Sequence, residues 1–399
     1  MIFPHRNKGL ESLKTFAPHS GRDYARLRNY DLGPGRHVHV SGLSPYLRHR
    51  LITEEEVLRS VLRQHSRAAA EKFVQEVFWR SYWKGWLELR PAVWTQYRAG
   101  LVRALDRTKT EGGLRQRWEH ACGGETGIDC FDHWARELRE TGYLHNHARM
   151  WFASIWIHTL NLPWELGADF FLRHLLDGDP ASNTLGWRWV AGLQTIGKTY
   201  LARPDNIRKF TKNRFDPKGL ASEAHPLHSD GHPPRGQAPQ NVEWRPSGRV
   251  GILVHDDDLN LKNLFNSEVY PISFTRLLTC EQRSPLAISQ DVADFAKGAL
   301  EDTTRRWAAR LGDDGGLHGT LDPILAWAQN FELDQVVTPY GATGPAKAML
   351  DDLEPRLEAL GISLVRVVNP YDSMIWPHAT HGFFRFKDNI GAFLDEMRI

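Results

Sequence analysis

The sequence predicts a multi-domain α and α/β protein, with an all-helical domain followed by an open α/β domain built on a parallel sheet. Two observations indicate this fold class. Up to about residue 221, apolar residues recur at helical spacing and strand signals are few. After a stretch rich in proline and glycine, short apolar runs alternate with helical segments. We therefore expect a helical domain over residues 1–221, a linker over 222–248 and an α/β domain over 249–399.

The helices of the first domain are predicted from capping and apolar spacing. A helix over 53–65 begins with Thr53 as N-cap and Glu56 at the capping-box position. A longer helix over 68–89 places apolar side chains such as Phe73 and Val77 about one face. The same pattern predicts further helices over 131–139, 146–160 and 164–176.

The composition changes between Ser222 and Gly248. This stretch contains five prolines, three glycines and almost no apolar residues. Proline removes a backbone donor and glycine raises the entropic cost of ordering, so neither a helix nor a strand forms easily there. We expect a linker, with Trp244 as the one large side chain able to dock on a domain.

The α/β domain is predicted from short apolar runs. Residues 249–255 (RVGILVH) have the continuous apolar character of a buried parallel strand. Further strands are expected over 271–278, 335–339 and 363–368, with helices over 289–310 and 343–360 between them.

Composition limits the classes of protein to which the chain can belong. It has 399 residues, 41% of them hydrophobic, and 50 Lys and Arg balance 48 Asp and Glu. Three scattered cysteines (Cys122, Cys130 and Cys280) exclude a disulfide scaffold and a four-thiolate iron–sulfur cluster. The most apolar stretch, 150–164, is too short to span a membrane, and the N-terminus lacks a signal-peptide core. We expect a cytoplasmic monomer without a membrane partner.

Four segments of the helical part carry the residues with chemical potential. They read SGLSPYL over 41–47, EVFWRSYW over 76–83, TGYLHNHARM over 141–150 and DGDPASNTLGWRW over 177–189. Each segment also has an ordinary explanation when taken alone: a capped turn, a surface ion pair, or tryptophans in a core. Eleven of the 15 tryptophans lie between Trp79 and Trp189, a concentration that the fold has to explain.

Taken together and in this order, the four segments resemble the flavin-binding helical domain of the photolyase/cryptochrome family, over about residues 24–219. The resemblance implies FAD as the cofactor and leaves the identity of any antenna pigment open. Asn183 would face the flavin N5, and Arg149 would pair with Asp177 beside the ring, while Arg80 would approach the phosphates. The residues that the resemblance assigns to the cofactor site are Tyr24, Ser41, Gly42, Leu43, Ser44, Phe73, Arg80, Asn146, Arg149, Asp177, Gly178, Asp179 and Asn183.

Elementary chemistry is compatible with these assignments. Hydroxyl groups just before a helical segment, such as those of Ser41 and Ser44, suit a pyrophosphate. Carboxylates such as those of Asp177 and Asp179 accept hydrogen bonds from flavin N–H and ribose hydroxyl groups. The protein supplies positioning and electronics, and the flavin supplies the redox chemistry.

The resemblance also implies an electron path and a substrate. Trp187 and Trp164 match the first two members of the family's electron-transfer chain, whose third member has no clean counterpart here. Glu76 and Trp79 match residues that meet a flipped-out pyrimidine dimer, and Met150 and Trp189 line the same cavity. The residues expected to contact substrate or DNA are Glu76, Trp79, His147, Met150, Trp189, Lys198 and Arg203; the last two belong to a stretch with seven Lys or Arg against two Asp.

The resemblance has departures, and they keep alternatives open. Val40, Phe73 and His147 replace a hydroxyl residue, a tryptophan and an arginine of the family pattern, and Thr184-Leu185 replaces Asn-Gly. The α/β segment follows the helical domain instead of preceding it, although the run 250–259 resembles the first strand and loop of the family's antenna domain. Asp256, Asp257 and Asp258 at that strand's end are read as loop capping, and no metal site is expected.

The functional hypothesis is therefore a DNA photolyase, a light-driven lyase that repairs cyclobutane pyrimidine dimers by electron transfer from reduced FAD. Glu76, Asn183, Trp187 and Trp164 would take part in the reaction. Asn146 and Met150 stand where photolyases of the (6-4) class carry histidines, which favours the cyclobutane class, but His145 and His147 lie beside them. A cryptochrome-like photoreceptor without repair activity and a (6-4) photolyase stay as the alternatives.

Overall fold

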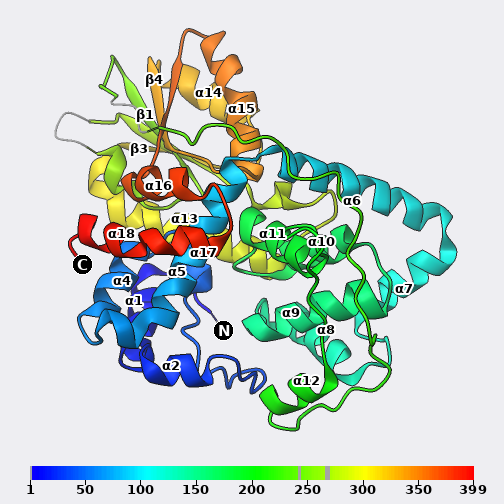
Figure 1. Cartoon of the computed structure of the whole chain (residues 1–399). Coiled ribbons are helices and arrows are strands. Elements are labelled where there is room, and N and C mark those ends of the chain that lie inside the picture. Colours follow the sequence, from blue (N-terminus) through cyan, green and yellow to red (C-terminus); the bar gives the residue numbers. More distant parts are fainter. Residues whose placement is uncertain (1, 241–243, 266–269) are drawn as a thin grey trace.

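The computed structural model describes residues 2–240, 244–265 and 270–399. It contains a helical domain and an α/β domain, confirming the fold class that the sequence predicts (Figure 1). None of the helices in these ranges is long and apolar enough to cross a membrane.

The helical domain consists of α1 (Arg6–Phe16), α2 (Arg22–Leu27), α3 (Ser44–Arg48), α4 (Glu54–Leu62), α5 (Arg67–Glu88), α6 (Ala92–Thr110), α7 (Gly112–Gly123), α8 (Asp129–Thr141), α9 (Asn146–Ser154), α10 (Trp164–His174), α11 (Pro180–Val190) and α12 (Pro204–Phe210).

Local sequence signals explain where several of these helices begin and end. Thr53 and Glu56 form the expected capping box of α4. Ser66 caps α5 through a hydrogen bond from the backbone N–H of Ala69. Gly142 ends α8 in the left-handed conformation, at a φ of 66°. Beyond Ser154, α9 continues as a π-helical turn over Ile155–Thr159, so the predicted helix 146–160 has two parts.

The α/β domain is built on a five-stranded parallel sheet with the order β3-β2-β1-β4-β5. β1 is buried along its whole length, as its continuous apolar run predicts. β2 pairs with it from Gly251↔Ser273 onward, and β4 pairs on its other side from Val250↔Gln335. The elements of this domain are β1 (Val250–His255), β2 (Ser273–Leu277), α13 (Gln290–Leu311), β3 (Asp313–His318), α14 (Asp322–Asn330), β4 (Gln335–Pro339), α15 (Pro345–Glu358), β5 (Ser363–Val367), α16 (Pro370–Ile375), α17 (Phe383–Phe386) and α18 (Ile390–Glu396).

The edge strand β3 was not predicted from the sequence, because Asp313–His318 (DDGGLH) lacks an apolar run. It pairs with β2 through an irregular register, starting at Ser273↔Asp313. Gly315 is required there, because a Cβ at this position would lie 2.2 Å from the indole of Trp327. The Trp327 Nε1–H in turn donates to Ser273 Oγ at 2.8 Å, which ties α14 to the sheet.

The linker lies along the helical domain. Within its described residues it forms neither helix nor strand, as predicted. The backbone N–H of Gly236 donates to the carbonyl of Leu89 at 2.8 Å, and that of Leu227 donates to Ala191 at 3.0 Å. Trp244 packs against the apolar core, in agreement with its expected docking role.

The C-terminal segment after β5 returns to the helical domain and lies over α4 and α5 (Figure 1). The hydroxyl groups of Tyr371 and Ser81 share a buried hydrogen bond of 2.7 Å. Gly85 allows this close packing, because a Cβ there would lie 2.8 Å from the Cα of Trp376. The last helix is also tied down, by an ion pair of 2.7 Å between Arg67 and Asp395.

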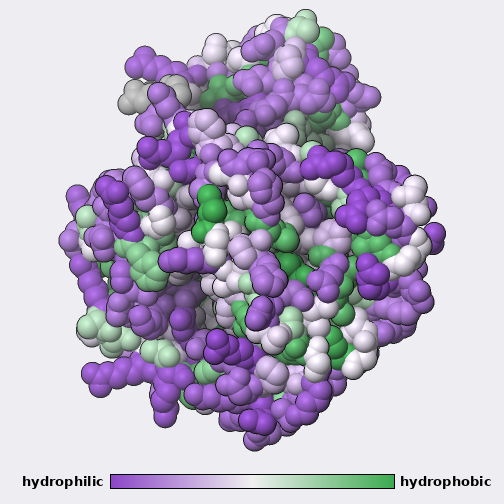
Figure 2. Space-filling view, turned by 45° about the vertical axis from the view of Figure 1, so that its right-hand side comes forward, coloured by the Kyte–Doolittle hydropathy of each residue, from purple (hydrophilic) through white to green (hydrophobic). Residues whose placement is uncertain are grey.

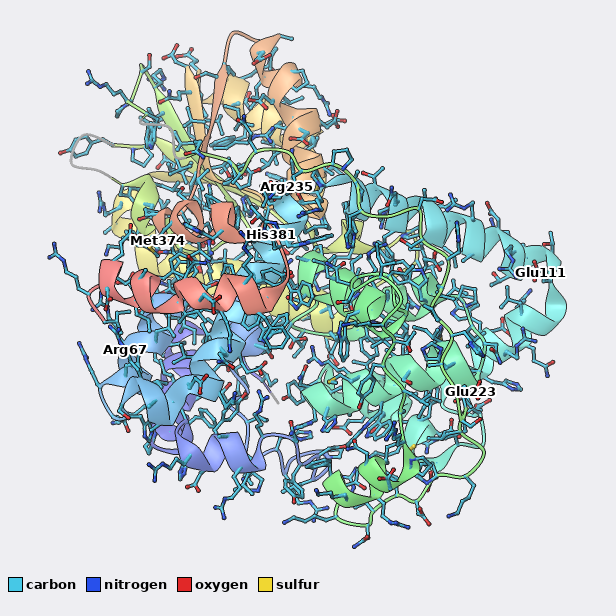
Figure 3. The ribbon with its side chains drawn as sticks, in the orientation of Figure 1. Arg67, Glu111, Glu223, Arg235, Met374 and His381 are labelled. Carbon is cyan, nitrogen blue, oxygen red and sulfur yellow. The ribbon has the colours of Figure 1, made fainter. Side chains whose placement is uncertain are left out.

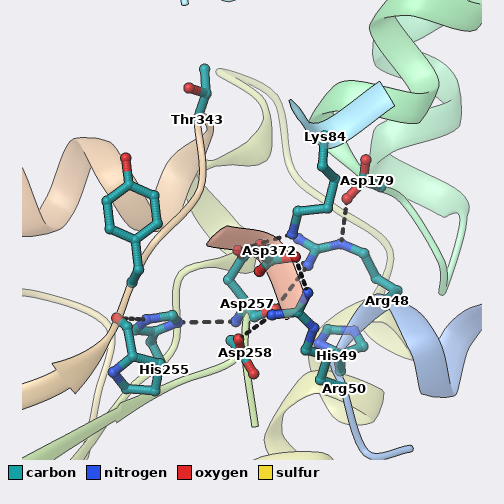
Figure 4. A network of polar contacts seen from close by, with 12 residues as sticks. Arg48, His49, Arg50, Lys84, Asp179, His255, Asp257, Asp258, Thr343 and Asp372 are labelled. Carbon is teal, nitrogen blue, oxygen red and sulfur yellow. Dashed lines mark hydrogen bonds and ion pairs between the residues drawn. The ribbon is translucent and has the colours of Figure 1, made fainter. Parts of the chain in front are cut away.

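Buried ion pairs join the two domains (Figure 4). Arg48 and Arg50, at and beyond the end of α3, meet the acidic residues that follow β1. Arg48 pairs with Asp257 at 2.7 Å, and Arg50 pairs with Asp258 at 2.6 Å. Arg50 also reaches Asp372 of α16, so one arginine connects three segments of the chain. The side chains of both arginines are each only 3% exposed, so these ion pairs are buried between the two domains.

These charges determine the ionisation of Asp257. Burial alone would raise the pKa of its carboxyl group, but Lys84 and Arg48 outweigh burial and hold that pKa well below its usual range. A carboxylate with a depressed pKa stabilises the fold above its unfolded-state pKa, and this contribution is lost as the pH falls towards the folded-state value.

Replacing Asp257 by Asn is expected to lower the free energy of unfolding by about 3–5 kcal/mol at pH 7, because Arg48 and Lys84 then stay buried without their partner. Urea unfolding measures the change. The difference from wild type should be constant above about pH 5 and shrink below about pH 4, where the wild-type carboxylate begins to lose its advantage. Asp322→Asn, at a well-exposed ion pair with Arg356, is the control and should cost about 1 kcal/mol or less. An equal effect of both variants would contradict the burial of these ion pairs.

Candidate functional site

The candidate site surrounds the loop between α10 and α11. α5 and α9 both pack against α11, and Arg48 at the end of α3 donates to the carbonyl of Gly178 just before α11 at 2.9 Å, so the four predicted motifs meet around α11. In the space-filling view, hydrophobic residues gather around the middle of a largely hydrophilic face, which is hollowed there (Figure 2). The sequence-predicted residues therefore belong to one region of the fold.

Asp177 and Arg149 form the pair that the resemblance implies. Arg149 Nη2 donates to Asp177 Oδ2 at 2.8 Å, and Arg149 Nε donates to the carbonyl of Leu144 at 3.0 Å. The other carboxylate oxygen, Oδ1, is buried and has no hydrogen-bond partner among the described residues. A buried oxygen without a partner is costly, so this atom is a suitable acceptor for a ligand N–H.

Asp179 begins α11 and stays ionised. Its Oδ1 accepts the backbone N–H of Ser182 at 2.8 Å, which makes it the N-cap of the helix. Burial would raise the pKa of its carboxyl group, but Lys84, Arg48 and Arg80 together lower it. A carboxylate that is anionic at neutral pH can act only as a hydrogen-bond acceptor.

Asn183 lies one turn further along α11. Its side-chain amide nitrogen donates to the carbonyl of Ala168 on α10 at 2.8 Å, which holds the amide in place. The residue is 9% exposed, so this amide lies at the edge of the core. An amide fixed by one of its own hydrogen bonds is preorganised for contact with a ligand.

The other side of the candidate site is formed by residues on or next to α2, α3 and α5. The ring of Tyr24 packs edge-on against Phe73, with ring centroids 5.1 Å apart. Ser41 Oγ accepts the backbone N–H of Leu43 at 3.3 Å, and Ser44 is the first residue of α3. Gly42 has a φ of +63°, and no atom lies within 4 Å of the position that a Cβ would take. The Ser41–Ser44 turn therefore borders open space.

Arg80, predicted to approach the phosphates, is engaged within the protein. It pairs with Glu54, and its other nitrogen donates to the carbonyl of Arg48 at 3.4 Å. Its side chain is 14% exposed, so only a small part of the guanidinium is accessible. The phosphate contact of Arg80 stays a prediction.

Glu76 and Trp79, predicted to meet the substrate, are both partly exposed on α5. Glu76 pairs with Arg28, just beyond α2. The indole of Trp79 stacks on Phe383 of α17, with centroids 3.6 Å apart and an interplanar angle of 12°. One face of this indole is thus covered by the C-terminal segment, a contact that sequence spacing does not reveal.

The residues from α9 differ in exposure. Asn146, predicted to bind the cofactor, is exposed, and Met150, predicted to line the substrate cavity, is partly buried. His147 stacks on Trp151 at a centroid distance of 4.1 Å, and its Nδ1 lies 3.0 Å from the carbonyl oxygen of Asn29. His145 is 1% exposed and caps α9 by accepting the backbone N–H of His147 at 3.1 Å. Burial lowers the pKa of His145 to about 4, so its ring is neutral at pH 7.

The two predicted members of an electron path lie in one apolar cluster. Trp187 meets Phe171 edge-on at 5.1 Å, and Trp164 lies 5.6 Å from Tyr97. Tyr97 is itself 5.2 Å from Trp94 on the same helix. Tyr97 thus connects Trp164 with Trp94 through ring contacts, which sequence spacing does not reveal.

Lys198 and Arg203 are exposed on the segment after α11. Between them, Tyr200 stacks on Trp189 at a centroid distance of 5.3 Å. This stack places the basic segment beside one of the residues predicted to line the substrate cavity.

Open α/β sheets usually bind ligands at the carboxyl ends of the strands, where the strand order reverses. In this sheet that switch point lies between β1 and β4, and it leaves little room for a ligand. Side chains of the helical domain fill this point. Glu88 accepts hydrogen bonds from the backbone N–H and the hydroxyl group of Thr343, each at 2.8 Å. Only about 10 Å³ is left beside Lys84, Asp257 and Thr343. A larger groove of about 470 Å³ lies elsewhere, between Trp94 and Arg98 of α6 and Pro345 and Arg356 of α15.

The residues around α11 fit FAD. Asp177 has a buried carboxylate oxygen that lacks a hydrogen-bond partner among the described residues, and the carboxylate of Asp179 is an anion held in place by Ser182. Gly42 leaves open space next to the hydroxyl groups of Ser41 and Ser44. Asp177, Asp179 and Asn183 would hold the flavin and ribose groups, and the Ser41–Ser44 turn would hold the pyrophosphate. Lys84 and Arg48 are further site residues that the sequence did not single out, because they act by setting the charge of Asp179.

The helical domain is similar to known proteins. Residues 73–221 match the family model described as the FAD binding domain of DNA photolyase. The chain is 33% identical over 195 residues to a deoxyribodipyrimidine photo-lyase of Streptomyces griseus, covering 46% of this chain and 41% of that protein. A deoxyribodipyrimidine photo-lyase of Escherichia coli is 27% identical over 205 residues, with 50% and 42% covered. The chain thus spans less than half the length of these relatives.

Two solved structures are also similar. A cryptochrome of Synechocystis is 24% identical, with a TM-score of 0.42, and 52% of this chain and 43% of that chain are covered. A class III photolyase of Agrobacterium tumefaciens is 26% identical, with a TM-score of 0.43 and the same coverage.

The buried His145 predicts a pH dependence of stability. Its folded-state pKa of about 4 lies below the ordinary value of 6.5, so the folded state binds fewer protons and loses stability as the pH falls through this window, by up to about 3 kcal/mol. His145→Asn keeps an N-cap acceptor for α9 but cannot titrate. Urea unfolding at pH 7 and pH 4.5 should show a smaller loss of stability for the variant than for wild type. His228→Asn, at an exposed linker position, should match wild type; an equal loss in all three proteins would contradict the buried neutral ring.

Proposed function

Because residues 73–221 match the family model described as the FAD binding domain of DNA photolyase, we propose that this protein is a light-driven DNA repair enzyme acting on cyclobutane pyrimidine dimers. The observation that carries the proposal is the convergence of two groups of residues on α11. Asp177, Arg149 and Asn183 form a polar cradle on one side, and Glu76 and Trp79 lie on α5, which packs against the same helix. A cofactor held in the cradle would lie close to a substrate held by α5.

When bound and reduced, FAD would supply an electron under blue light to the dimer and regain it after the ring opens, with no net redox change. The chain's own residues position both partners. Asp177 is oriented by Arg149, and Asp179 is kept anionic by Lys84 and Arg48, so both carboxylates accept hydrogen bonds at neutral pH. Trp187 of α11 and Trp164 of α10, which belong to one apolar cluster, are suited to relay electrons to the cofactor.

The surroundings of the histidines favour the cyclobutane class over the (6-4) class. His145 is buried, neutral at pH 7 and engaged as the cap of α9. His147 is stacked on Trp151 and held at Asn29. In the same motif Asn146 is exposed and Met150 is partly buried, and neither side chain can act as a general acid at neutral pH.

One observation supports a second candidate, a flavin photoreceptor without repair activity. Phe383 covers a face of the Trp79 indole, which reduces the aromatic surface that a flipped base can stack on. In that case the same cradle would bind FAD, and the chain would respond to light without discriminating between damaged and undamaged DNA.

The proposal is tested by illuminating the reduced, FAD-loaded protein with an oligonucleotide that carries one thymine dimer. We expect the dimer to disappear under blue light and to persist in the dark, measured by chromatography of the oligonucleotide. An oligonucleotide with a (6-4) lesion should be unchanged. Unchanged dimer counts, together with equal affinity for damaged and undamaged duplexes, would reject repair in favour of the photoreceptor.

The role of Glu76 gives a second prediction. Glu76→Gln removes the carboxylate that would meet the dimer, and we expect the repair rate to fall about 10-fold or more while FAD binding is kept. Since Glu76 also pairs with Arg28, the variant Arg28→Gln separates the two roles: it breaks the ion pair but keeps the carboxylate, and should retain most of the rate.

Glu71→Gln, at an exposed position of the same helix, is the matched control and should repair at the wild-type rate. If Arg28→Gln lost as much activity as Glu76→Gln, the ion pair rather than the carboxylate would account for the effect.

A further inference from the structure

The short helix α17 exposes an aromatic side chain beside the candidate substrate site. Phe384 is 78% exposed, although its neighbours Phe383 and Phe386 are buried in the apolar core. Leaving a phenylalanine in water forgoes roughly 2 kcal/mol of burial free energy. A single exposed apolar residue is common on protein surfaces, so a binding role for Phe384 depends on the groups that surround it.

The helix is held firmly against α5. Besides the stack of Phe383 on Trp79, the hydroxyl group of Tyr82 donates to the carbonyl of His381 at 2.7 Å. Arg90 donates to the carbonyl of Thr380 at 2.9 Å. Phe384 is therefore displayed on an ordered support, one residue away from the ring that stacks on Trp79.

Positive charge gathers around Phe384. Lys387 lies over its ring, with the ammonium nitrogen 5.8 Å from the centroid. The pKa of His381 is lowered, first by Arg385, then by desolvation, and also by Arg235 and Arg90, so these cations converge on one place. Figure 3 labels Arg235, from the linker, beside His381 near the end of α5. Between 378 and 389 the single acidic residue is Asp388.

We propose that α17, in the segment that follows the sheet and packs on α5, is a DNA contact in which Phe384 packs against bases or sugars next to the lesion and Arg385 and Lys387 bind phosphates. That the partner is DNA rests on the proposed function. Aromatic side chains next to cations suit nucleic acid because rings stack on bases and cations pair with phosphates. Apolar wedges also enter base steps that have been partly unstacked, as they are where a damaged base leaves the helix.

This contact extends the interface beyond the residues that the sequence predicts. Lys198 and Arg203 lie after α11 in the helical domain, whereas α17 follows the sheet. The linker connects the two regions, since His232 approaches the carbonyl of Gln194 at 3.2 Å and packs edge-on against Trp86 of α5. A DNA strand would thus be contacted from both sides of α5.

The test compares wild-type protein with Phe384→Ala and with Arg385→Ala/Lys387→Ala. Fluorescence anisotropy measures affinity for a duplex with one thymine dimer and for its undamaged counterpart, over a series of salt concentrations. Phe384→Ala should weaken binding of the damaged duplex 3- to 10-fold without changing the salt dependence. The double variant should weaken binding of both duplexes and reduce the slope of log affinity against log salt by about 1.8, the value for two phosphate contacts.

The controls remove one exposed apolar side chain and two exposed cations elsewhere on the surface. Val102→Ala deletes a side chain that is 51% exposed on α6, and Lys109→Ala/Arg115→Ala removes two exposed cations from α6 and α7. Both should bind DNA with wild-type affinity and slope. Unchanged FAD content and urea midpoint in every variant show that the fold is intact.

The outcomes separate this inference from the proposed function. If wild type repairs dimers and the α17 variants bind as wild type does, α17 is not a DNA contact and the proposed function stands. If wild type shows no repair, but the α17 variants bind undamaged duplex more weakly and with a smaller slope of log affinity against log salt, the DNA contact stands and the repair proposal fails. Effects of equal size in the control variants would overturn the α17 contact.

Discussion

The buried ionic contact between Arg48 and Asp257 is the interaction on which the rest of this structure depends. Arg48 is 2% exposed, and besides Asp257 it donates to the carbonyl of Gly178 at 2.9 Å. A single guanidinium thus holds the end of β1 and the loop between Asp177 and Asp179. Removing a charge from water is expensive, and the attraction at this short distance compensates only if the partner is in place. Docking of the sheet and shaping of the proposed FAD site are therefore coupled.

This coupling gives the α/β domain a structural role in the site. Glu88 and Lys84 of α5 enter the switch point of the sheet, the place where a domain of this kind usually holds a ligand. The same helix carries Glu76 and Trp79 on its accessible part, and the C-terminal segment stacks on Trp79. α5 therefore serves as an interface with the sheet along one part and as the wall of the candidate site along another.

Much of the fold could be predicted from the sequence, because helix caps and apolar spacing are local signals. The capping box at Thr53 and the buried run of β1 are examples. β3 could not be predicted, since its Gly-rich sequence becomes a strand only through pairing with β2 and packing of Trp327. The acidic residues after β1 were explained as loop capping, and Asp258 does accept the backbone N–H of Asn260 at 3.0 Å. Their pairing with Arg48 and Arg50 spans about 200 residues, a long-range contact that spacing cannot reveal.

The central claim is that the cradle formed by Asp177, Asp179, Asn183 and the Ser41–Ser44 turn holds FAD. The most direct measurement is the absorption spectrum of the purified protein, followed by titration of flavin-free protein with FAD. The account predicts blue-absorbing flavin bands, or saturable FAD binding that Asp177→Asn weakens at least 10-fold. A colourless wild-type protein that binds no added FAD would contradict it.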